Sequence, residues 1–130
     1  MTNDFIRSES AQSVTDVVAR VEQSSKANGF GVLNTLNLQQ IMANKGVEYA
    51  EAATVVEICQ PDYAKKFLEI DPRVAPCLPC RIAVTSEGGK TIIQTVRPSA
   101  MMKIFQNESM DVVATEVDDI IGKIIADATS

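Results

Sequence analysis

The stretch ICQPDYAKKFLEIDPRVAPCLPCRIAV, from Ile58 to Val84, decides the fold. It holds all three cysteines and four of the five prolines of the 130-residue chain. Its first residues end a β-rich run, Pro61 suits the first position of a helix, and Asp71-Pro72 ends that helix. Cys80 then opens a second β-rich run. The pattern predicts two successive strands joined by a short helix, with a cysteine where the first strand ends and another where the next begins.

Downstream, Gly88-Gly89 separates two β-rich runs, Cys80 to Glu87 and Lys90 to Arg97. A two-residue Gly-Gly link is typical of a β-hairpin. With Glu87 opposite Lys90, the register places Cys80 opposite Arg97. A guanidinium beside a thiol favours the thiolate, and so does the helix N-terminus that follows Cys59. A register shift of one residue would undo this placement.

The remaining elements follow from periodicity and capping signals. Strands are predicted over 4–9, 30–36 and the latter half of 48–58, and brief helices over 37–43 and 99–105. One long helix is predicted from a cap at Ser10 or Ser13 to about residue 27, and another from a cap at Asn107 or Ser109 to about residue 128. The order strand, helix, four strands, helix predicts one α+β domain over 1–130. It has two layers, with two long helices on one face of a mostly antiparallel sheet of about five strands.

Composition narrows the function classes. With 45% hydrophobic residues, the chain can bury roughly two thirds of the surface that it exposes when unfolded. It carries 12 basic and 17 acidic residues, a net charge of −5, and no basic cluster, so nucleic acid is not expected as a partner. No segment approaches the ~20 apolar residues of a membrane span, and no signal peptide is recognised. We therefore expect a cytoplasmic protein without structural disulfides.

The chain contains no histidine. Ser/His and Cys/His catalytic pairs and Cys/His zinc sites are thereby excluded. The phosphate loop GxxxxGK and the dinucleotide motif GxGxxG are also missing from the sequence. No nucleophile and base pair can be named, so the sequence favours a protein that is not an enzyme.

The cysteines allow three interpretations. A thioredoxin-like CxxC begins a helix, whereas Cys77-Leu78-Pro79-Cys80 leads into a strand, so thioredoxin chemistry is not expected. Cys59 and Cys80 can form a functional thiol pair. Together with Cys77 they can instead hold a soft metal ion, Cu(I), or Zn(II) with a fourth ligand from water or another subunit. They can also be inert apolar residues, because free cysteine is often buried.

Several short motifs resemble the bacterial and archaeal family catalogued as domain of unknown function 302. They are Gly29-Phe30-Gly31-Val32, Ile58-Cys59-Gln60-Pro61, Asp71-Pro72, Leu78-Pro79-Cys80 and the Pro98 after the hairpin. The likeness runs from about Phe5 to Ile125. It implies a curved antiparallel sheet with strand order like that of the TATA-binding-protein fold, and frequent pairing as a homodimer. Cys59 and Cys80 match the family's cysteine positions and Cys77 does not, while the family brings no established activity.

The sequence therefore predicts a small cytoplasmic homodimer with a thiol site at Cys59, Cys77 and Cys80, in which Arg97 favours the thiolate. The first hypothesis is a binding or carrier protein that senses redox state or handles sulfur as a persulfide. The second is a soft-metal binding protein that uses the three cysteines. The third is a structural or partner-binding domain with inert cysteines.

Overall fold

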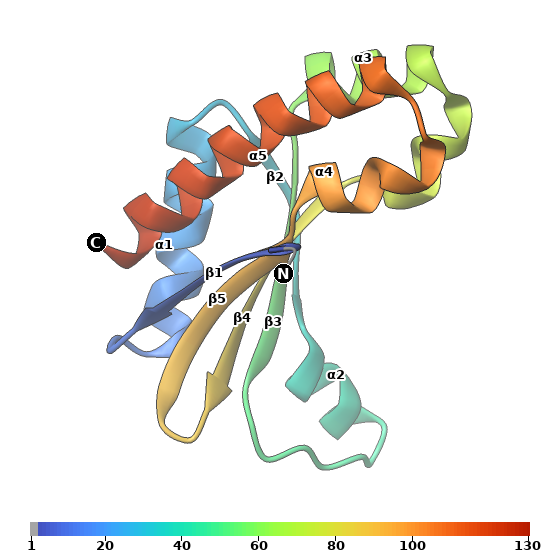
Figure 1. Cartoon of the computed structure of the whole chain (residues 1–130). Coiled ribbons are helices and arrows are strands. Elements are labelled where there is room, and N and C mark those ends of the chain that lie inside the picture. The colour runs from blue at the N-terminus through green and yellow to red at the C-terminus, as the bar shows by residue number, and fades with distance from the viewer. Residues whose placement is uncertain (1–2) are drawn as a thin grey trace.

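The computed structural model describes residues 3–130 and contains a five-stranded antiparallel sheet in the order β1-β5-β4-β3-β2. Each predicted strand is present within a few residues of its expected bounds. The strands are β1 (Phe5–Ser10), β2 (Gly31–Asn37), β3 (Ala53–Cys59), β4 (Cys80–Glu87) and β5 (Lys90–Val96). The sheet is visibly curved, and β5 bends most clearly in Figure 1.

The two long helices are α1 (Val14–Ala27) and α5 (Glu108–Thr129). Of the two candidate caps for each helix, the structure uses Ser13 and Asn107. Ser13 Oγ accepts from the Asp16 N–H at 3.1 Å, and Asn107 Oδ1 accepts from the Met110 N–H at 3.1 Å. Short helices occupy the connections: α2 (Leu38–Asn44), α3 (Pro61–Ile70), η1 (Pro72–Cys77), α4 (Pro98–Met101) and η2 (Met102–Phe105).

The core lies between one face of the sheet and the pair α1 and α5. Facing residues of neighbouring strands, Val56 with Ile82 and Val84 with Ile93, are fully buried. The Ser24 hydroxyl on α1 donates to the Ile124 carbonyl on α5 at 2.8 Å, which ties the two helices together. The predicted two-layer α+β architecture is confirmed, with α5 running across the sheet beside α1 (Figure 1).

The hairpin between β4 and β5 has the predicted turn and register. Gly88 and Gly89 have φ values of +57° and +87°, which a glycine adopts without a Cβ clash. Glu87 lies opposite Lys90, and pairing continues from there to Ala83 opposite Gln94. The ladder does not extend to Cys80 and Arg97, so the predicted placement of Arg97 opposite Cys80 is wrong.

The other face of the sheet carries charged side chains that pair with one another. Arg81 on β4 bonds Glu57 on β3 at 2.9 Å, and Arg7 on β1 lies 3.4 Å from Glu9. Such pairs suit a solvated surface. Within residues 3–130, none of the helices combines the length and the apolar character that a membrane crossing requires.

Candidate thiol site at the ends of β3 and β4

Cys59 and Cys80 lie at the same end of the sheet. Cys80, the first residue of β4, pairs with Ile58 of β3, and Cys59 is the next residue along β3. Gln60 follows and caps α3, since its side chain accepts from the Tyr63 N–H at 2.9 Å. The antiparallel order therefore brings together two cysteines that are 21 positions apart in the chain.

The two cysteines line one narrow, apolar crevice. Its free space is about 10 Å³, close to the room that a single water molecule needs. The other walls come from the loop before β2, from α3, from the segment between η1 and β4, and from α5. They include Phe30, Tyr63, Phe67, Leu78 and Val117. A larger molecule can enter only if these side chains move.

The Cys80 thiol is protonated at neutral pH. Burial, followed by the nearby Cys59 and to a lesser extent Asp118, raises the pKa of Cys80 from 9.0 to about 11, against the opposing charge of Arg81. Burial has the largest effect because a thiolate anion loses its hydration among apolar side chains. The expectation of a depressed thiol pKa is therefore wrong for Cys80.

Arg97 is engaged away from the thiols. Its Nε donates to the Asn3 carbonyl at 2.9 Å, and its backbone N–H donates to the Asp4 carbonyl at 2.7 Å. The pairing of β4 with β5 ends before Arg97. Near that end of the two strands, the Thr95 hydroxyl donates to the Arg81 carbonyl at 2.5 Å. Arg81 is the cation that lowers the pKa of Cys80. Its position next to Cys80 in the sequence could have indicated this role.

Cys77 does not join the crevice. It ends η1 and packs, half-buried, against the outside of the core. In the part of the chain from residue 3 to residue 130, no three His, Cys, Asp or Glu side chains gather closely enough to hold a metal ion. The three-cysteine metal site predicted from Cys59, Cys77 and Cys80 is thus not formed, and the CxxC spacing does not act as one unit.

Asp118 is a neighbour of the site that sequence reasoning missed. It is only 7% exposed, and its carboxylate accepts from the Ser99 N–H at 3.0 Å and the Ser99 hydroxyl at 2.5 Å. The carboxylate thereby fixes the start of α4 beside the thiol site. The sequence signal was an acid within the apolar stripe of the last helix, directly after the buried Val117.

Cys80 also borders a second, wider hollow of about 210 Å³ on the side of β5 and α4. Arg81, Thr95, Pro98 and Met101 contribute to its walls. Cys80 therefore lies between a narrow crevice and a wider hollow.

Comparison with known proteins yields a family and a fold. The profile of "Domain of unknown function DUF302" matches residues 6–128. A crystal structure of an uncharacterized conserved DUF302 protein from Bacillus stearothermophilus superposes with a TM-score of 0.93 at 21% sequence identity, covering 98% of this chain and 99% of that one. At that identity the likeness establishes the fold alone. A search of curated proteins finds no significant match.

Proposed function

The chain belongs to the DUF302 family, and from this premise we propose that it is a non-enzymatic binding protein with an oxidation-sensing thiol pair, Cys59 and Cys80. One observation supports the proposal above all. Two free cysteines line the same apolar crevice, at the ends of hydrogen-bonded strands. Because Cys80 keeps its proton at neutral pH, it is a stable thiol at rest and not an activated nucleophile.

The chemistry is a two-electron oxidation by a hydroperoxide. The Cys59 sulfur attacks the peroxide and the O–O bond breaks, so that Cys59 becomes a sulfenic acid, and the departing oxygen takes the Cys59 thiol proton and leaves as an alcohol or water. The Cys80 sulfur then attacks the sulfenic sulfur and displaces hydroxide, which takes the Cys80 proton and leaves as water. Cys59 is the first nucleophile because burial keeps Cys80 protonated.

Strand geometry supports a disulfide between the two cysteines. Opposed strand residues are about 5 Å apart and successive residues rise about 3.3 Å, so the two Cα atoms are about 6 Å apart, inside the disulfide range. Successive side chains of a strand point to opposite faces, however, and Cys59 is one residue beyond the partner of Cys80. The end of β3 must therefore twist before the disulfide can form.

The test is oxidation of the folded protein with hydrogen peroxide, followed by peptide mass mapping. We expect a Cys59–Cys80 disulfide that survives in Cys77→Ser and disappears in Cys59→Ser and Cys80→Ser. A Cys77–Cys80 link would contradict the proposal. So would three thiols that react with an alkylating agent only after unfolding, in which case the cysteines are packing residues of a partner-binding domain. The same spectra report any persulfide or bound metal.

We further propose that the protein works as a homodimer in the cytoplasm. The three unpaired cysteines suit a reducing compartment. Exposed large apolar side chains, including Leu33 and Ile104 at 62% and 74% exposure, suit a chain that associates. Sedimentation equilibrium measures the association, and a chain that remains a monomer at about 100 µM would exclude a functional dimer.

A further inference from the structure

One stretch of the chain, which includes β2 and α2, contains few charged residues. Charged residues make up 22% of the chain, yet Lys45 and Glu48 are the only two among residues 31–49. The same part is rich in exposed apolar side chains. Five of the ten large hydrophobic residues that are exposed in the described chain lie there: Leu33, Leu38, Ile41, Val47 and Tyr49. We call residues 31–49 the β2–α2 corner.

The corner includes an edge strand without the usual protection. Edge strands commonly carry charges or proline, which discourage pairing with another chain. β1, at one edge of the sheet, has Arg7 and Glu9, whereas β2, at the other edge, has the uncharged sequence GVLNTLN. A bulge between Val32 and Asn34 places Leu33 in solvent at 62% exposure. The β2 edge therefore offers both free backbone groups and an apolar side chain.

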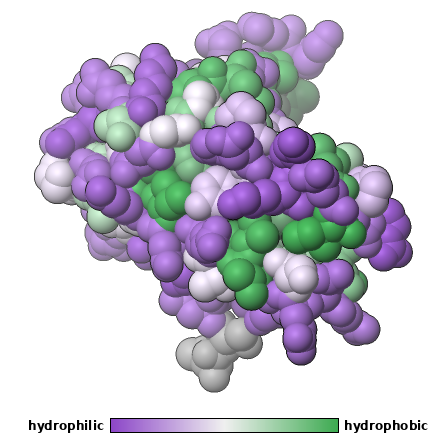
Figure 2. Space-filling model, turned by 90° about the horizontal axis from the view of Figure 1, so that it is seen from above, coloured by the Kyte–Doolittle hydropathy of each residue, from purple (hydrophilic) through white to green (hydrophobic). Residues whose placement is uncertain are grey.

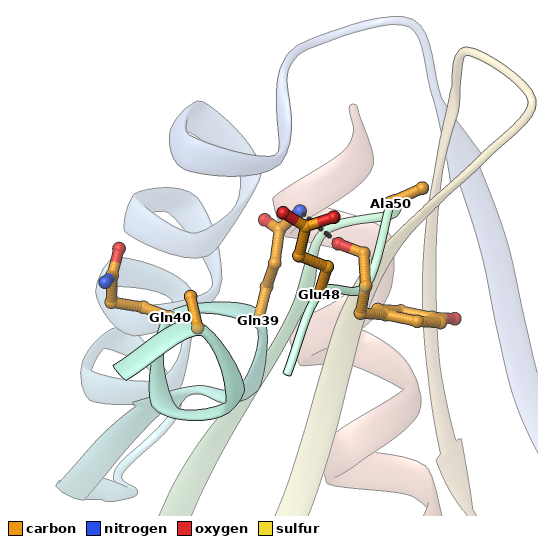
Figure 3. A pocket seen from close by; sticks show the side chains of 6 residues that line it. Gln39, Gln40, Glu48 and Ala50 are labelled. Carbon is orange, nitrogen blue, oxygen red and sulfur yellow. Dashed lines mark hydrogen bonds between the residues drawn. The ribbon is translucent and has the colours of Figure 1, made fainter. Parts of the chain in front are cut away.

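The α2 helix beside this edge buries none of its residues. It is held in place by polar contacts: Asn37 caps it, and the Gln39 amide donates to the Tyr49 carbonyl at 2.9 Å. Figure 3 shows this bond and the open hollow of about 520 Å³ between α2 and residues 48–50. Its walls carry Gln39, Gln40 and Glu48. A helix that packs so little against its own domain is suited to packing against another.

We propose that the β2–α2 corner is the surface through which two copies of this chain pair, an inference that rests on the homodimer proposed above. Electrostatics favours a second copy as the occupant. Each copy carries a net charge of −5, whereas Lys45 and Glu48 leave the residues of the corner with no net charge, so two copies that meet there bring less negative charge together than an average contact would. Lys45 and Glu48 also lie close in sequence within the corner, so a two-fold axis can set each against the opposite charge of the other copy.

Other exposed apolar residues lack this continuity. On the face seen from above, apolar side chains form separate patches divided by hydrophilic ones (Figure 2). Val112 on α5 is an example: it is 62% exposed but lies in a shallow hollow with Asp111 and Glu116. Scattered residues of this kind are ordinary on monomeric proteins. Val112 therefore provides a matched control for Leu33, which has the same exposed fraction.

The experiment compares the full chain with Leu33→Glu, Ile41→Glu and Val112→Glu by sedimentation equilibrium under reducing conditions. All three positions are exposed, so the variants should fold, and circular dichroism verifies this. A two-fold contact places the new carboxylates of both copies in one interface. We expect the dimer dissociation constant to rise about 100-fold or more for Leu33→Glu and Ile41→Glu and to stay within about threefold for Val112→Glu.

Two other outcomes overturn the inference in different ways. A wild-type chain that is monomeric at about 100 µM removes the homodimer and its surface together. A wild-type dimer that Leu33→Glu and Ile41→Glu leave intact, or that Val112→Glu weakens equally, keeps the homodimer and rejects this surface. Because the measurement is made on reduced protein, it is independent of whether Cys59 and Cys80 form a disulfide.

Discussion

Alkaline pH should destabilise the protein through Cys80. Burial holds the pKa of this thiol at about 11 in the folded state, whereas its ordinary value is 9.0. The folded-state pKa is higher than the pKa in the unfolded chain. The protonated Cys80 thiol therefore makes its full contribution to the stability of the fold below about pH 9, and this contribution is lost as the pH rises through about 11. Each pH unit between the two pKa values is worth roughly 1.4 kcal/mol. Ionisation of this thiol should therefore lower the free energy of unfolding by about 2–3 kcal/mol.

The assay is urea unfolding at pH values from about 8 to about 11, comparing the wild type with Cys80→Ser. Serine is of similar size and stays neutral in this range, so the difference between the two chains isolates Cys80 from lysines and tyrosines that titrate in both. Cys77→Ser is the matched control, and it should keep the wild-type loss because Cys80 is intact. If the wild type and Cys80→Ser lose stability in parallel, burial does not hold the proton and the crevice is open to water.

Three further changes test the fold by urea unfolding at neutral pH. Ile93→Ala, which empties a fully buried position opposite Val84, should cost about 2–5 kcal/mol, and a cost below about 1 kcal/mol would contradict the assigned core. Asn107→Ala removes the cap of α5 and should cost about 1 kcal/mol, with a visible loss of helix signal at its start. In Gly122→Ala, inside α5, the added Cβ meets no atom within 4 Å, so the protein should become more stable by about 0.5–1 kcal/mol. In Gly89→Ala the residue has a φ of +87°, so the protein should become less stable by about 1–2 kcal/mol. Equal effects at the two sites would refute the assigned Gly-Gly turn.

The helix caps and the hairpin turn were predicted correctly because each depends on residues that are close together in the sequence. A helix cap needs a side-chain oxygen two or three residues before a free N–H, and Asn37 and Asn107 both make that bond. The Gly-Gly turn fixes the register of its own hairpin through adjacent residues. The choice between Ser10 and Ser13 required coordinates, since both can cap and only the fold decides where β1 ends.

The errors at the site came from interactions between distant residues. Extending the hairpin register to Arg97 assumed that β4 remains its neighbour, but the backbone of Arg97 bonds Asp4 before β1 instead. The pKa of Cys80 was predicted from charge alone. Its largest determinant is burial by α3, α5 and the β2 loop, and a sequence does not show how tightly those elements close around a strand end.

The backbone of Gly31 and Cys59 connects the proposed thiol pair with the proposed dimer surface. Gly31, the first residue of β2, lies opposite Cys59, and a Cβ at Gly31 would stand 3.7 Å from the Cys59 carbonyl. A twist at the end of β3 that brings Cys59 toward Cys80 must therefore move the start of β2, two residues before the exposed Leu33. If copies pair along β2, oxidation and association act on the same ladder, and thermodynamic linkage requires that each alter the other by an equal factor. The edge position of β2 gives this coupling its route, because no further strand lies outside it within the described sheet to hold it fixed.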